Sequence, residues 1–281
     1  MTDPKSIFGI NTYSYTLDYS AAETIRHLGG QGYPGFELMM YTGHFWPGEV
    51  DEAQKREIRS AVSSTGTRLI SFNMPNIDLN IAGASPEVRA YSLGLLSSFI
   101  RLAGELDVPA IVVGPGKANP LFSPGQELLL GHFYKALDTL APIAKQAGVR
   151  LLVENMPFAF LPDADSLMKA LDDYGDPDVG VIYDVANGHF IGEDPCEGLR
   201  KVSKRLGLVH FSDTGRKIYR HDTIGLGDVP FAAFPPVLKE IGYAELPVLE
   251  VISRNADADT LDSAARLAAI GYGRAGTRTS A

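Results

Sequence analysis

Cysteine is almost absent from the sequence, which has one, Cys196, among 281 residues. A single cysteine cannot form a disulfide within the chain, and such sparse use is typical of proteins in a reducing compartment. Long apolar runs are absent too: no stretch approaches the roughly 20 apolar residues of a membrane-spanning helix. The first residues, MTDPK, lack the apolar core of a signal peptide. We therefore expect a cytoplasmic protein that does not cross a membrane.

Runs of lysine or arginine are also absent, and the net charge is −9. Nucleic-acid-binding proteins present basic surfaces because much of their affinity comes from neutralising phosphates. The charge therefore argues against a nucleic-acid partner and favours a small neutral or singly charged substrate.

Apolar strand patterns and helical patterns alternate along the whole chain. The expected strands are Ile7–Ile10, Phe36–Met40, Arg68–Asn73 and Ala110–Val113, with four more beginning near Arg150, Gly180, Gly207 and Leu246. The expected helices are Ser20–Leu28, Asp51–Ser64, Glu87–Leu106, Gln126–Ala147, Ala164–Tyr174, Glu197–Leu206, Pro230–Ile241 and Asp259–Ala269. Eight such units predict an α/β protein, a single (β/α)8 TIM barrel over residues 1–281. The polar tail 271–281 is expected to be loosely packed.

Four strands in the second half of the chain end on residues that commonly bind metals. These strand-end residues are Glu154, Asp184, His210 and Glu250. In parallel α/β folds the carboxyl ends of the strands meet at one edge, where the chemistry is kept. A single strand-end carboxylate is more often a helix N-cap, but four on successive strands are not explained by capping alone. Three carboxylates and one imidazole favour one divalent ion: Mn²⁺, Mg²⁺, Co²⁺ or Zn²⁺.

Other residues at the strand ends are expected to shape a pocket. Asn11 and Tyr13 follow the first strand, and Asn73 and Asn76 follow the third. Gly114-Pro115-Gly116-Lys117 follows the fourth, where its backbone N–H groups and Lys117 could meet an anion; a tight turn is the favoured alternative. The aromatic loop 41–47 (YTGHFWP) is interpreted as a lid or as a contact between copies of the chain, which leaves a homo-oligomer open.

Four segments resemble the xylose-isomerase-like barrel superfamily. They are residues 152–155 (LVEN), 183–189 (YDVANGH), 209–213 (VHFSD) and 220–231 (RHDTIGLGDVPF). This superfamily includes ketose 3-epimerases, hydroxypyruvate isomerases, inosose dehydratases and the endonuclease IV group. The resemblance covers nearly the whole chain and is specific for the superfamily rather than for one reaction.

The resemblance implies roles for particular residues. Glu154, Asp184, His210 and Glu250 match four metal ligands, and in the epimerases the two glutamates also exchange a proton across the substrate. Arg216 matches a substrate-binding arginine, and Glu37 matches an acidic residue that orients its neighbours at the substrate site. His189 and His221 resemble histidines that bind substrate or a further metal, with loop packing as the alternative.

Two positions depart from the ketose 3-epimerase pattern. Phe160 stands where those enzymes have a substrate-binding glutamate, and Asn187 stands where they have a histidine. Both changes argue against a free ketose and predict a more apolar far end of the pocket. The endonuclease group needs extra histidines at the second and third strand ends, which this sequence lacks.

The leading hypothesis is a metal-dependent isomerase or epimerase of a sugar or polyol-derived carbonyl compound, acting through a metal-stabilised enediolate. The second is a lyase that dehydrates a keto-sugar or inosose, or eliminates from a 3-keto-glycoside. The third is a barrel that binds a sugar without turning it over. The four ligands by themselves do not choose between the first two.

Overall fold

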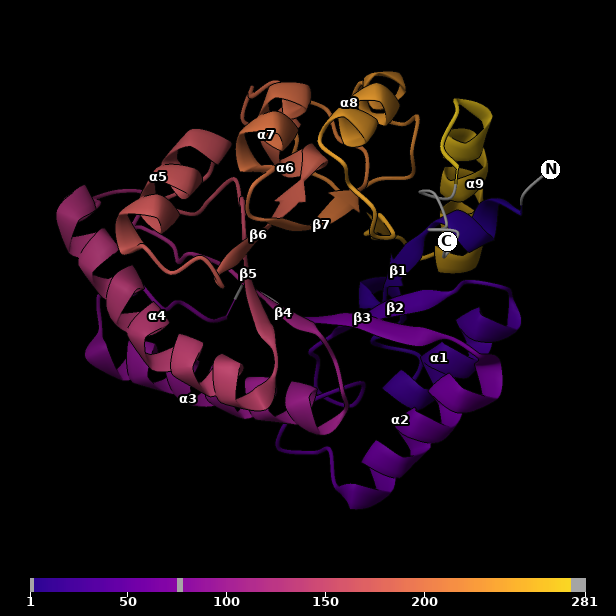
Figure 1. Cartoon of the computed structure of the whole chain (residues 1–281), viewed down its shortest axis with the longest axis horizontal. Coiled ribbons are helices and arrows are strands. Elements are labelled where there is room, and N and C mark those ends of the chain that lie inside the picture. The colour runs from indigo at the N-terminus through magenta and orange to yellow at the C-terminus, as the bar shows by residue number, and fades with distance from the viewer. Residues whose placement is uncertain (1–2, 75–77, 274–281) are drawn as a thin grey trace, which may run out of the picture.

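A computed structural model describes residues 3–74 and 78–273 of the chain. Within them, eight parallel strands close into a barrel in chain order, and β1 pairs with β8. The helices form an outer ring around this barrel (Figure 1), so the predicted (β/α)8 barrel is confirmed. The strands are β1 (Gly9–Asn11), β2 (Gly35–Met39), β3 (Arg68–Asn73), β4 (Ala110–Val113), β5 (Arg150–Glu154), β6 (Gly180–Asp184), β7 (Leu206–Phe211) and β8 (Val248–Leu249).

The helices begin and end at local sequence signals. For example, Ser20 and Glu23 form a capping box that starts α1, and Gly148, with φ 70°, ends α4. The described helices are α1 (Ala21–Gly30), α2 (Glu52–Thr65), α3 (Pro86–Glu105), α4 (Gln126–Ala147), α5 (Ala164–Tyr174), α6 (Val185–Phe190), α7 (Pro195–Val202), α8 (Phe234–Glu240) and α9 (Ala256–Ala269). Of these, none is both long enough and apolar enough to span a membrane.

Three of the differences from the sequence prediction have clear local causes. Helix α6 was not expected, and it starts directly after β6 because the Asp184 side chain caps it. Helix α7 stops at Val202, since the chain from Leu206 already pairs with β6 as β7. Helix α8 starts at Phe234, later than predicted, after a short 3-10 turn over Phe231–Ala233.

The barrel interior is an apolar layer below a polar one. Strand residues Ile70, Ala110, Val112, Leu152, Ile182, Leu208 and Val248 form a separate buried cluster. Side chains on a strand alternate between its two faces, so the residue two positions further on points the same way. Leu152, Ile182, Leu208 and Val248 are each followed at that spacing by one of the four predicted metal ligands. The strand period therefore directs all four ligands inward, above the apolar layer.

Residues of the predicted loose tail and of the aromatic loop pack against the barrel. Tyr272, in the predicted loose tail, is buried against Phe8 and Phe211 and donates a hydrogen bond to the Phe231 carbonyl. The rest of that tail, 274–281, lies outside the described residues. In the aromatic loop, Phe45 is buried against Phe72. Phe45 therefore belongs to the core, and the interpretation of the loop as a lid or a contact between copies of the chain stays a prediction.

Candidate metal centre

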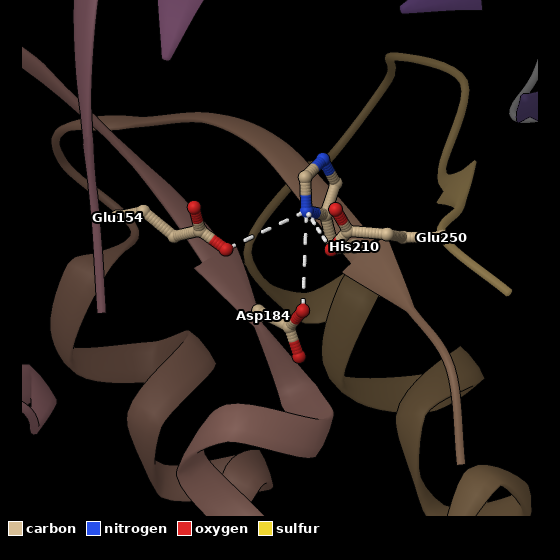
Figure 2. Close-up of side chains that lie close together, drawn as sticks. All are labelled: Glu154, Asp184, His210 and Glu250. Atoms are coloured by element: carbon tan, nitrogen blue, oxygen red, sulfur yellow. Dashed lines mark ion pairs between the residues drawn. The ribbon is translucent and has the colours of Figure 1, made fainter. Parts of the chain in front are cut away.

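The four strand-end side chains meet at one point inside the barrel mouth. One ligand atom from each of Glu154, Asp184, His210 and Glu250 lies within 4.8 Å of the others, and all four residues are buried. Figure 2 shows the carboxylates around one ring nitrogen of the histidine. That nitrogen, His210 Nδ1, lies 3.0 Å from Glu250, 3.7 Å from Glu154 and 3.9 Å from Asp184. The geometry brings the predicted set together; its role as a metal centre stays a prediction.

Glu37 forms an ion pair with His210 behind the cluster. The other ring nitrogen, His210 Nε2, lies 2.8 Å from Glu37 Oε1. Glu37 is fully buried and accepts hydrogen bonds from Asn11 (2.7 Å), Ser71 (2.5 Å) and Asn73 (3.0 Å). A carboxylate behind a histidine ligand fixes the ring and its tautomer. Glu37 is thus placed to orient His210 and does not line the cavity beside the cluster; its role at a substrate site stays a prediction.

Several buried polar atoms of the cluster lack partners among the described residues. Asp184 Oδ1 accepts the Asn187 N–H at 2.9 Å, whereas Asp184 Oδ2 has no hydrogen bond. His210 Nε2 meets Glu37 as an ion pair without suitable hydrogen-bond geometry, and His210 Nδ1, which the carboxylates surround, has no hydrogen bond either. Because buried polar groups are normally satisfied, these atoms fit a cation bound between them. Oxygen and imidazole donors together suit a hard or borderline divalent ion.

Burial and close charges shift the ionisation of the cluster. Burial raises the pKa of Glu154 to about 7 and that of Asp184 to about 6. Burial alone would lower the pKa of His210, but Glu37 and Glu250 outweigh it and raise that pKa well above its usual range. For Glu250 the effect of burial is outweighed by His210 and His221, which lower its pKa to about 2. Without an ion, protonated His210 thus supplies positive charge at the centre of the carboxylates.

A hydrogen-bonded chain links Glu154 to the opposite side of the cluster. The Asn187 amide nitrogen donates to Glu154 (3.3 Å) and to the Asn155 carbonyl (2.9 Å), so its oxygen accepts from the Tyr219 hydroxyl (2.6 Å). Tyr219 has one proton to give, and it therefore accepts from Nε2–H of His221, 2.6 Å away. His221 Nδ1 in turn lies 3.4 Å from Glu250. Sequence reasoning missed Tyr219, because only the fold of the loop after β7 brings it to Asn187.

Tyr219→Phe is expected to weaken Mn²⁺ binding about tenfold, in the range reported for residues that orient metal ligands. If Tyr219 acts by holding Asn187 against Glu154, Asn187→Ala should have a similar effect, and the double variant should lose no more. Isothermal titration with Mn²⁺ measures all three dissociation constants. Tyr174→Phe, which removes a surface hydroxyl that donates to Asp138, is the matched control. Losses that multiply in the double variant would show that Tyr219 acts independently of Asn187.

A cavity of about 380 Å³ opens above the cluster. Of the predicted site residues, those that line it are Glu154, Glu250, His221, Asn73 and Lys117. The backbone of Lys117 is bonded at both N–H and C=O to the Asn80 side chain, each at 2.9 Å. Gly116, with φ +107°, has no room for a side chain beside Ala82. These contacts fit the tight-turn interpretation of this loop.

Two predicted substrate contacts lie outside the cavity. His189 is buried, and its Nε2 lies 2.7 Å from Asp228, so it packs the loop after β7. Arg216 is exposed, with its guanidinium beside Gly192. Neither residue lines the cavity, so the structure does not bring them to the cluster, and their contact with a substrate stays a prediction. Asn76 lies outside the described residues.

Comparison with curated proteins finds relatives of two kinds. An uncharacterized protein of Methanocaldococcus jannaschii is 29% identical over 182 residues, which are 62% of this chain and 61% of that protein. The chain thus matches about three fifths of the length of that relative. A probable endonuclease 4 of Methanoculleus marisnigri is 25% identical over 221 residues, 72% of this chain and 77% of that protein.

Among solved structures, similar folds come from sugar epimerases. A D-tagatose 3-epimerase-like protein has a TM-score of 0.80 at 23% identity, over 94% of this chain and 96% of that one. The 3-keto-D-glucoside 4-epimerase of E. coli has a TM-score of 0.78 at 18% identity, over 94% of this chain and 99% of that one. At such low identity these likenesses establish the fold alone. Residues 26–270 match the family described as xylose isomerase-like TIM barrel, and the chain therefore belongs to that family.

Proposed function

We propose that the protein is a divalent-metal-dependent isomerase or epimerase of a sugar or related carbonyl compound. The proposal rests on which carboxylates reach the cavity. Glu154 and Glu250 line it, whereas Glu37 and Asp184 are fully buried and do not. Glu154 comes from the end of β5 and Glu250 follows β8, so they approach a bound molecule from different sides of the barrel. Two such carboxylates are what a proton transfer between two faces or two carbons of a substrate requires.

The residues would divide the work as follows. Glu154, Asp184, His210 and Glu250 would hold the ion, whose charge stabilises the enediolate that forms when a proton leaves carbon next to a carbonyl. One glutamate would take that proton and the other would return it. Burial raises the pKa of Glu154 to about 7, whereas the nearby histidines lower that of Glu250 to about 2. In the absence of an ion, Glu154 can thus carry a proton near neutral pH while Glu250 is ionised.

A nuclease is the alternative suggested by the endonuclease 4 relatives. Within the described residues, the one cluster suited to a metal ion is the four-residue set above, and the net charge is −9. A phosphodiester substrate is usually met by a basic surface. These observations support a small sugar or polyol-derived substrate over a nucleic acid.

The direct test is incubation of the Mn²⁺-loaded protein with ketoses, keto-acids, inososes and keto-glycosides in D₂O, followed by NMR and mass spectrometry. An isomerase or epimerase is expected to place deuterium on carbon and to leave the backbone otherwise unchanged. Loss of water or of an aglycone would identify a lyase on the same residues instead. Absence of both outcomes across all four substrate classes would contradict an enzyme of this kind.

A further inference from the structure

The wall of the cavity beyond the carboxylates is mostly apolar. Besides Glu154, Glu250 and His221, the cavity is lined chiefly by aliphatic, thioether and aromatic side chains, including Met39, Met74, Leu79, Ile81, Met156 and Phe158. The first four are buried, and each is at most 4% exposed. Apart from the cluster and its neighbours, the polar side chains at this wall are those of Tyr13, Asn73 and Lys117.

Polar side chains are few on this wall, and two positions that would hold sugar hydroxyls in a ketose 3-epimerase do not contribute to it. The Asn73 amide already donates to Glu37. Phe160 turns away from the cavity and packs edge-on against Phe133 of α4, with ring centres 6.1 Å apart. Asn187 is buried and bonded to Glu154, Asn155 and Tyr219. A free ketose has a hydroxyl on each carbon beyond the reacting centre, and hydroxyls placed against the aliphatic, thioether and aromatic side chains of this wall would lose water without gaining partners.

The same wall is suited to an aromatic ring. Methionine side chains adapt to irregular apolar groups, and their sulfur atoms make favourable contacts with ring edges. Phe158, at the cavity, remains 63% exposed. It meets Tyr219 edge to face, with centroids 5.5 Å apart at 87°, and packs against Phe190. A bound aromatic group could therefore cover Phe158 while its sugar faces Glu154 and Glu250.

Building on the proposed function, we propose that the substrate is a cyclic keto-sugar that carries an apolar, planar group, such as an aryl aglycone. The carbonyl end would lie at Glu154, Glu250 and His221, and the aryl group would lie against Met74, Met156 and Phe158. The cavity thereby selects glycoside-like molecules over free ketoses.

The test compares phenyl β-D-glucopyranoside with methyl β-D-glucopyranoside by titration calorimetry on the Mn²⁺-loaded protein. The phenyl glycoside is expected to bind about tenfold more tightly or better, because its ring buries apolar surface that the methyl group cannot. Phe158→Ala should reduce this preference severalfold. Phe122→Ala removes an equally large side chain that is 88% exposed and outside the cavity, and it should keep the preference. Equal affinities, no binding of the phenyl glycoside, or an unchanged preference in Phe158→Ala would overturn the inference.

Neither probe has a carbonyl group, so the result does not depend on proton transfer. A protein that exchanges deuterium into free ketoses but shows no phenyl preference would refute the substrate class alone. A protein with the phenyl preference but no exchange on any carbonyl substrate would refute the proposed reaction alone.

Discussion

Glu154→Gln is expected to slow the exchange of substrate carbon-bound hydrogen with D₂O by about a hundredfold or more, within the usual range for general acid–base groups. The amide keeps the size of the carboxyl group but cannot take up the proton. Glu250→Gln should have an effect of the same order, because a carboxylate is needed at both positions. NMR can follow deuterium incorporation into whichever carbonyl substrate the wild-type protein turns over, and it gives the exchange rate of each variant.

Because both glutamates are also predicted ligands, metal content has to be measured in parallel. A variant that retains the ion but loses exchange would separate proton transfer from metal binding. Glu245→Gln is a matched control: Glu245 is exposed and lies 3.5 Å from Arg68, the first residue of β3, at the other end of the barrel. Full exchange by either Glu154→Gln or Glu250→Gln with metal bound would refute the two-carboxylate mechanism.

Asp184→Asn is expected to remove the stabilisation that a divalent ion confers. An ion that binds only the folded protein adds about 2.7 kcal/mol at a hundred times its dissociation constant, which thermal denaturation with and without Mn²⁺ would detect. Asparagine is a good N-cap, so the start of α6 at residue 184 should survive the substitution. Asp173→Asn, on the exposed surface of α5 beside Lys169, is the control. Equal Mn²⁺ stabilisation of Asp184→Asn and wild type would exclude Asp184 as a ligand.

The stabilisation of the folded protein by Mn²⁺ should increase with pH. Burial raises the pKa of Glu154 to about 7 and that of Asp184 to about 6, and the pKa of His210 lies well above its usual range. An ion needs ionised carboxylates and an unprotonated ring nitrogen, so protons compete with it at all three groups. Mn²⁺ should therefore stabilise the protein more at about pH 8 than at about pH 6. A larger effect at the lower pH would contradict this assignment of the ligands.

The fold and the central cluster could be predicted from the sequence because both depend on local periodicity. A buried parallel strand is recognisable as a short apolar run, and a side chain two positions beyond an interior residue points the same way. Glu154 follows Leu152 and Asp184 follows Ile182 at that spacing. Parallel strands also end at one edge, so strand-end residues distant in sequence could be expected to meet.

The residues around the cluster could not be predicted in the same way. They lie in loops, and a loop has no regular alternation of side chains that the sequence would reveal. Arg216 and Tyr219 lie three residues apart in the loop after β7, yet the first is exposed and the second is hydrogen-bonded to Asn187. The presence of Phe160 led to the prediction of an apolar pocket. Phe160 itself packs against Phe133, and the apolar side chains at the cavity include Met156 and Phe158 instead. An irregular loop is held by contacts with segments far along the chain. The positions of its side chains, and with them the shape of the cavity, are therefore decided only by the tertiary structure.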